Sequence, residues 1–279
     1  MRRRVSAALI AAVASLPVVS PLCAGDGLLP GASDQDPLTI EANRLDMRDS
    51  RQLLIYTGDI LVANGPSSLK SADLRIHLDN ASAGAASTTD RVNSIEANGP
   101  VVINTQKETY SGNRLQYDRK QNKIFMIGNV TIQQGEGLTR ADHLEFDKAS
   151  STALLTGNVV FQKGAATVKG ERLIYDQARD KILVLNNVVY VSGETSVTGR
   201  KMDFDRKANT AVFTGNVVYV KRDTVVRGDS MEYNLTTNQG VVRTGAAPAA
   251  SANSTGAASS AAPGNRVKAI FTPGQAKGI

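Results

Sequence analysis

The chain has 279 residues, with 32 Lys or Arg against 26 Asp or Glu, and a formal net charge of +6. A hydrophobic fraction of 41% excludes a chain that is disordered throughout, since it is enough apolar material to build a core. One Cys excludes a disulfide scaffold and a cysteine-based metal centre, and two His leave little for a histidine-rich site. Composition therefore points away from enzymes.

Residues 1–24 have the three-part arrangement of an export signal. Three Arg at positions 2–4 precede an apolar segment, residues 5–16, and small residues lead up to Ala24. Two prolines interrupt this region, which favours a cleaved signal over the alternative, a retained membrane anchor. Cleavage after Ala24 would lower the formal charge from +6 to +3 and remove Cys23. We expect an exported protein without a nucleic-acid partner.

From Leu38 onward the chain repeats with a period of 29 residues. The step from Gly58 to the next repeat is longer, and the excess lies in residues 80–90, which we interpret as an insertion loop. The clearest column consists of glycine or asparagine at equal spacing: Gly99, Gly128, Gly157, Asn186 and Gly215.

Apolar columns come in pairs two residues apart, which predicts strands, because alternate strand residues share one face. One pair of columns consists of Leu115, Leu144, Leu173, Met202 and Met231 with Tyr117, Phe146, Tyr175, Phe204 and Tyr233. The other consists of Val101, Val130, Val159, Val188 and Val217 with Ile103, Ile132, Phe161, Tyr190 and Tyr219. Asp or Asn follows the aromatic column and predicts a tight turn. Each repeat is therefore two strands, and the fold class is all-β.

Stacking of such repeats predicts an elongated, open β-jellyroll or solenoid-like array of about fourteen antiparallel strands. The predicted organisation is a signal peptide at 1–24, a linker at 25–37, a β domain at 38–243 and a low-complexity, disordered tail at 244–279. We interpret the basic end of the tail as solvated, with a docking peptide as the alternative.

Three segments resemble the OstA/LptA family of periplasmic lipopolysaccharide-transport proteins of Gram-negative bacteria. These are IEANRLDMRDSRQLLIYTGDILV, TRADHLEFDKASSTALLTGNVVF and VKGERLIYDQARDKILVLNNVVYV. The LptA branch is the most similar, since a cleavable signal differs from the anchored LptC and a long C-terminal barrel region, as in LptD, is absent. The resemblance implies a periplasmic carrier whose apolar groove holds the acyl chains of lipid A. It also implies head-to-tail assembly, with LptC-like and LptD-like OstA domains as partners.

The resemblance places the groove wall at nine positions: Leu38, Ile40, Val62, Ile103, Ile132, Phe161, Tyr117, Phe146 and Tyr175. For any single one of these residues, a place in an ordinary core is the alternative. An apolar groove suits this cargo, because each CH₂ group removed from water contributes about 0.8 kcal/mol.

Catalytic and metal-binding interpretations find no support in the motifs. The chain has no G-x-S-x-G, P-loop or H-E-x-x-H motif. The repeated aspartates, one for each 29 residues, are too sparse for a calcium-binding β-roll and are better explained as turn residues. We expect no cofactor, metal or catalytic residue. The alternative function is a ligand-free β-solenoid that polymerises as an envelope scaffold, and an enzyme acting on envelope polysaccharide is least favoured.

Overall fold

The computed structural model describes residues 29, 32, 36–79, 91–234, 236–237, 239–245 and 268–271. The predicted signal peptide and insertion loop lie outside the described residues. The described residues fall into two compact units: the first comprises 29, 32 and those within 36–161 and 172–179, and the second comprises those within 162–171, 180–245 and 268–271. We call them the first and the second unit.

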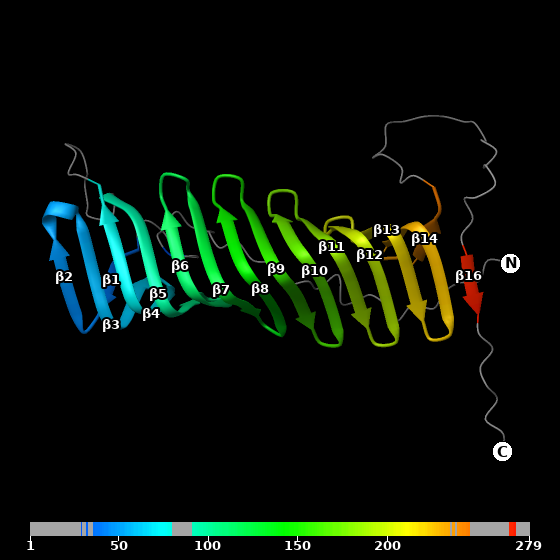
Figure 1. Ribbon diagram of the computed structural model, residues 1–279, viewed down its shortest axis with the longest axis horizontal. Helices are drawn as coiled ribbons and strands as arrows, with labels where there is room; N and C mark the ends of the chain where they lie inside the picture. Colours follow the sequence, from blue (N-terminus) through cyan, green and yellow to red (C-terminus); the bar gives the residue numbers. More distant parts are fainter. Residues whose placement is uncertain are drawn as a thin grey trace, which may run out of the picture. The chain divides into compact units, whose positions relative to one another are not determined.

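The first unit consists of antiparallel strands that follow one another in chain order (Figure 1). Its strands are β1 (Leu38–Glu41), β2 (Arg44–Arg48), β3 (Leu53–Asn64), β4 (Ser67–Leu78), β5 (Val92–Asn104), β6 (Glu108–Asp118), β7 (Lys123–Gln134), β8 (Gly137–Asp147), most of β9 (Thr152–Lys163) and the end of β10 (Ala166–Asp176). One short 3₁₀ turn, Asp49–Arg51, connects β2 with β3.

The second unit continues the same pattern of hairpins. It contains the start of β10, then β11 (Lys181–Ser192), β12 (Thr195–Asp205), β13 (Thr210–Lys221), β14 (Thr224–Asn234), β15 (Gln239–Arg243) and β16 (Lys268–Phe271). β16 lies within the interval predicted as a disordered tail, and the residues between Gly245 and β16 lie outside the described ones.

The strands hydrogen-bond in sequence order from β3 to β15, with β1 and β2 both on β3 and β16 on β14. The sheet stays open, because the described strands at its two ends do not pair with each other. This confirms the predicted all-β class and the antiparallel repeats of two strands. The described strands number sixteen rather than about fourteen, partly because the first and last strands are each in two pieces.

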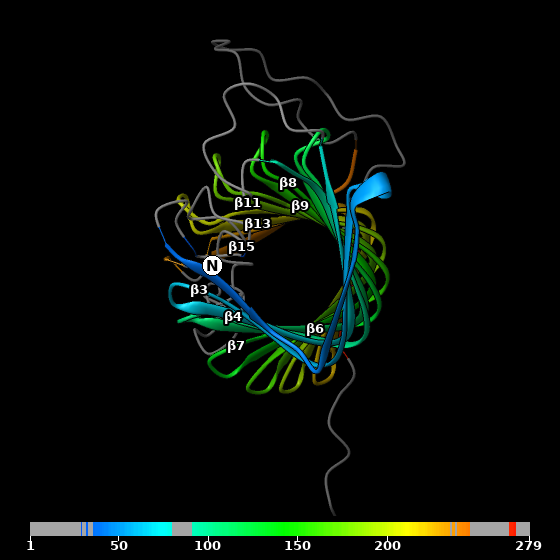
Figure 2. The same ribbon diagram turned by 90° about the vertical axis from the view of Figure 1, so that its left-hand side faces the viewer.

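Every second long strand, from β3 to β13, carries residues of positive φ and a β-bulge near its middle. In β7 the register shifts between Ile127 and Val130, because Gly128 and Asn129 both have positive φ, 76° and 49°. Glycine adopts this left-handed conformation without steric cost, and asparagine is among the few other residues that enter it readily. The glycine/asparagine column of the sequence is therefore the row of bends, and strands of the first unit curve accordingly (Figure 2).

A second column, of small residues, faces the bends from the neighbouring strands. Gly112 lies opposite Val101, and a Cβ atom there would come within 2.7 Å of the Met126 side chain. In the second unit a Cβ on Gly170 would lie 2.5 Å from Val184. Small residues recur at these positions because the inner side of a bend is crowded.

The aspartates that follow the aromatic column open the turns, as the sequence predicts. The carboxylate of Asp147 accepts a hydrogen bond from the backbone N–H of Ser150 at 3.0 Å, and Asp205 accepts one from Ala208 at 2.8 Å. Backbone hydrogen bonds are the largest cause that lowers the pKa of Asp147, Asp176 and Asp205 below the ordinary value. These residues are structural, and the described residues include no cluster of three or more potential metal ligands.

Candidate functional site

The bend in each strand turns its two halves toward one another, so that one face of the sheet becomes an interior. In the first unit, an apolar cavity is lined by Val62 and Leu69 from one side of the bends and by Leu74 and Ile76 from the other. In the second unit, Tyr190 and Phe213 come from opposite sides of their bends and place their ring centres 6.4 Å apart. The apolar columns therefore meet across each interior.

The nine predicted wall residues all belong to the first unit and all face this interior. Seven are buried: Val62, Ile103, Ile132, Phe161, Tyr117, Phe146 and Tyr175. Leu38 and Ile40, on the terminal strand β1, are half-buried and line the cavity. These side chains pack against one another as a core.

The cavity also contains a residue from outside the strand array. Leu29, nine residues before β1, lines the same cavity as Leu38, Ile40 and Val62 and is only 5% exposed. Its backbone carbonyl accepts a hydrogen bond from Ala32, which is buried as well. The cavity has a volume of about 20 Å³ and a wholly apolar lining, so the side chains nearly fill it.

Leu29 lies in the interval predicted as a linker, and the sequence pattern does not predict that its side chain is buried. The available signal is the apolar pair at positions 28 and 29, which follows the predicted signal peptide and has no partner in the repeat columns. A residue outside the 29-residue register cannot be assigned to a face by periodicity alone.

The interior contains few charged groups. Burial raises the pKa of Tyr190, Tyr219 and Tyr233 above the ordinary value, which reflects the apolar surroundings of their phenols. Among the buried residues that the structure describes, Glu108 is the one acid, and the Tyr110 hydroxyl donates a hydrogen bond to its carboxylate. The interior thus suits hydrocarbon and offers little to a charged substrate.

The outer side of the bends carries polar pairs that the sequence columns do not reveal as such. Asn158 donates to the carboxylate of Asp142 at 2.9 Å, and Asn43 donates to Asp59 at 3.1 Å. In the second unit, Glu171 accepts hydrogen bonds from Asn186 at 3.0 Å and from Asn187 at 2.6 Å. These pairs link neighbouring strands where the ladder is interrupted, and we assign them a structural role.

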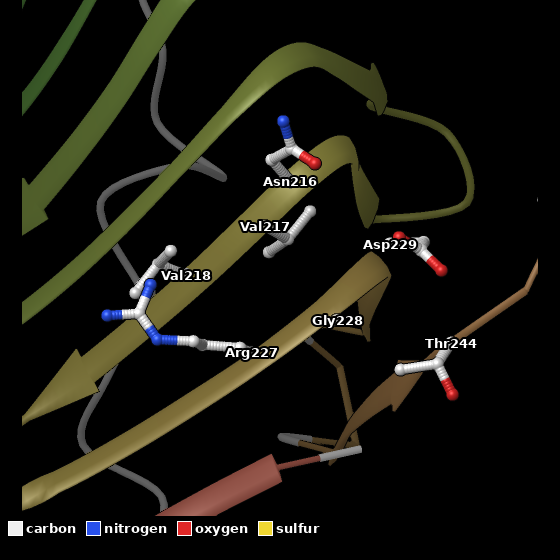
Figure 3. A pocket seen from close by; sticks show the side chains of 7 residues that line it. All are labelled: Asn216, Val217, Val218, Arg227, Gly228, Asp229 and Thr244. Carbon is white, nitrogen blue, oxygen red and sulfur yellow. The ribbon is translucent and has the colours of Figure 1, made fainter. Parts of the chain in front are cut away.

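A more open pocket of about 370 Å³ lies at the last bend of the second unit (Figure 3). Asn216, Val217 and Val218 of β13 line it, together with residues 227–229 of β14 and Thr244 after β15. Its lining is mixed rather than apolar, and it lies beside the end of β15, where the described chain leaves the sheet.

The family model described as "LptA/(LptD N-terminal domain) LPS transport protein" matches residues 39–150 and 138–239. The chain belongs to this family. The LptA/LptD N-terminal family is a transport family without enzymatic activity, so this chain is a lipopolysaccharide-transport protein rather than an enzyme. The matched residues coincide with the array of bent strands.

A search of curated proteins finds no match. Among solved structures, the chain is similar to LptH of Pseudomonas aeruginosa, the LptA-homologous periplasmic component of the lipopolysaccharide transport device. The sequence identity is 17%, the alignment covers 40% of this chain and 76% of LptH, and the TM-score is 0.34. Within the described residues, no helix has the length and apolar character required to cross a membrane.

Proposed function

We propose that this chain is a periplasmic carrier that shelters the acyl chains of lipopolysaccharide between the two halves of its bent strands. The proposal goes beyond family membership in naming the interior as the binding site and the nine wall residues as its lining. Export by the predicted signal peptide would deliver the chain to the periplasm, where such a carrier works.

The observation that carries the proposal is the burial of Leu29 between the walls. Leu29 belongs to no strand, yet its apolar side chain sits among Leu38, Ile40 and Val62. The walls therefore accept an apolar group supplied from outside the array. An acyl chain has the same chemistry, and each CH₂ group that enters gains about 0.8 kcal/mol.

Opening of the interior requires the walls to move apart about the bends. Each bulge has residues with positive φ, such as Gly128 and Asn129 in β7, and an interrupted hydrogen-bond ladder. Bulges of this kind are the natural hinge of a bent sheet, because fewer ladder bonds resist a change of angle there. The wall side chains would then exchange contacts with one another for contacts with lipid.

The proposed transport route continues from one copy of the fold to the next. Both ends of the array expose strand edges, and exposed edges pair with other strands unless they are blocked. A head-to-tail contact of this kind is heterologous and extends into open filaments. We propose OstA domains of the LptC-like and LptD-like type as partners at the two membranes.

Photo-crosslinking tests the binding site. A photoreactive residue at Ile132, which faces the interior, is compared with one at the adjacent Thr131, which points away from it. The exported protein is purified without detergent and mixed with lipopolysaccharide. We expect crosslinks from position 132 and from the equivalent position 161, with few or none from position 131.

The alternative is a ligand-free scaffold with a permanently filled core. It predicts no crosslink from any interior position in a protein that still assembles end to end. Crosslinks of equal strength from positions 131 and 132 would also contradict the interior site, since they would indicate binding to the outer surface.

A further inference from the structure

The last strand of the array consists of two separate pieces. β15 pairs with Ser230–Asn234 of β14, and β16 pairs with Thr224–Arg227. On its other side β14 pairs with β13 over the same two segments, with the bulge between them. β15 and β16 therefore occupy the places of the two halves of one bent strand, and 24 residues, 244–267, separate them in the sequence.

The sequence explains the interruption. In β13 the second half is rich in strand-forming residues, Val217–Val220. After Gly245 the chain instead continues as Ala-Ala-Pro-Ala-Ala, and Pro248 has no N–H to donate to a ladder. Strand-forming residues return only at Val267–Phe271, two residues before a further proline, Pro273.

The point of departure is the bend itself. The backbone N–H of Gly245 donates to the carboxylate of Asp229 at 2.6 Å, and Gly245 has a φ of 109°. Gly228 and Asp229 lie between the segments of β14 that pair with β15 and β16. The pocket of Figure 3 lies against these two residues, at the gap between the two pieces.

We propose that β16 is the displaced second half of the terminal strand and that β15 and β16 together form the edge that receives β1 and β2 of a second copy. This inference rests on the proposed end-to-end assembly. A strand added to a sheet moves the open edge outward and does not remove it. β16 therefore extends the docking edge rather than blocking it.

The two edges match piece by piece. β2 has five residues and pairs with the first half of β3, whereas β1 has four residues and pairs with the second half. β15 likewise has five residues and β16 has four. Antiparallel docking that continues the pattern of the array places β2 on β15 and β1 on β16, with both breaks at the level of the bend.

Exposed apolar side chains gather on the same strands. Leu45 and Met47 of β2 are 45% and 66% exposed, whereas Val241 of β15, 48% exposed, lies on the opposite face from Val242. Extending the register in which Phe213 pairs with Met231 and Ala211 with Tyr233 places Leu45 opposite Val242 and Met47 opposite Gly240. Docking would therefore bury Leu45 and Met47 as their column equivalents are buried in the array.

Ile270→Pro tests the role of β16, because proline cannot be accommodated in the middle of a paired strand. Ala258→Pro, in the low-complexity segment, is the matched control. Hydrogen exchange measures protection of the Thr224–Arg227 amides in dilute protein, and sedimentation measures assembly. We expect Ile270→Pro to speed exchange at 224–227 and to weaken association about tenfold or more, with neither change in the control.

Two outcomes overturn the inference. Unchanged exchange at 224–227 in Ile270→Pro would mean that β16 does not pair with β14. Faster exchange with equal or stronger association would make β16 a cap rather than part of the edge. A wild-type chain that stays monomeric although 224–227 is protected would overturn both the docking role and the proposed assembly. Lipid crosslinking at Ile132 would test the carrier function separately.

A disulfide experiment tests the register. Leu45→Cys with Val242→Cys, in the mature chain or with Cys23 replaced by Ser, should give an oxidation-dependent ladder of linked copies. Facing residues of antiparallel strands have Cα atoms about 4.5–5.5 Å apart, within disulfide range. Leu45→Cys with Val241→Cys is the control and should give no more than a trace. An equal ladder in the control would contradict the register.

Discussion

The inner strands and the terminal strands of this protein use the same residue columns but bury them very differently. Leu144 in β8 and Leu45 in β2 hold equivalent places before a turn, yet Leu144 is 1% exposed and Leu45 is 45% exposed. The difference is the number of neighbouring strands. The side chain of a column residue is covered by the strands on both sides. On a terminal strand one of these neighbours is missing, so the equivalent side chain is exposed to solvent.

The same comparison holds for the backbone. Inner strands pass through the bend without a break and have a neighbour on each side, whereas the terminal strand at each end breaks there. β1 and β2 are separated by Ala42 and Asn43, and β15 and β16 by residues 244–267. A terminal strand pairs with one neighbour only, so fewer hydrogen bonds stabilise its backbone at the bend. It therefore tolerates a break there that an inner strand does not.

Truncation of the two equivalent leucines should give the greatest difference in stability. Leu144→Ala should lower the free energy of unfolding by about 2–5 kcal/mol, because it leaves a cavity in a packed interior. Leu45→Ala should cost less than about 1 kcal/mol in dilute protein, because water already reaches the side chain. Urea unfolding measures both, and equal losses would show that β2 is buried in the free chain.

A glycine pair tests the crowding of the bends. Gly157 has a φ of 75°, and a Cβ there would lie 2.2 Å from the Asp142 carboxylate; Gly135 has a φ of 53° with nothing within 4 Å. Gly135→Ala should cost about 1–2 kcal/mol through backbone strain alone. Gly157→Ala should cost about 1–3 kcal/mol more, through overpacking. If thermal unfolding shows the same loss of stability in both variants, crowding does not explain why glycine recurs in the glycine/asparagine column.

Leu29→Ala tests whether the first cavity has an occupant that lipid displaces. The substitution should lower stability by about 1–3 kcal/mol, because a buried side chain is truncated. If an acyl chain takes the place of Leu29, lipopolysaccharide should bind the variant more tightly than it binds the wild type. Weaker binding, measured by titration under identical conditions, would instead make Leu29 part of the lipid site.

The smallest effect concerns acid. In the folded chain the pKa of Asp147, Asp176 and Asp205 is lowered. Their ionised carboxylates therefore stabilise the fold above the pKa of an unfolded Asp, about 3.9, and this stabilisation is lost as pH falls through the folded pKa. Replacing all three by Asn should reduce the acid sensitivity of unfolding below about pH 4. Asn234, which accepts backbone N–H bonds from Thr236 and Thr237 at 2.9 Å, shows that Asn can fill this place. If the pH dependence of unfolding is unchanged in this variant, other titrating groups cause the acid sensitivity.

Much of the fold could be predicted from the sequence because its signals are local and repeated. Alternation of Val130 and Ile132 predicts a strand whichever strands lie beside it, and an aspartate such as Asp147 predicts a turn from its own side-chain chemistry. The site was harder. Periodicity predicts that Ile132 and Phe161 share a face, but it does not distinguish a filled interior from an open groove, since both require apolar inward side chains.

Sequence patterns suffice to predict the all-β class, the two-strand repeat, the turn residues and the inward face of the repeat strands. The tertiary structure alone shows that the glycine/asparagine column forms a bulge in every second long strand, so that two halves of one face meet as an interior. It also decided that Leu29 lies inside and that β16 pairs with β14 across 24 intervening residues. Residues in the repeat have neighbours at a fixed spacing in the sequence, so their contacts can be predicted from periodicity. A segment outside the repeat has no such spacing, and its position depends on which surface of the folded chain it covers.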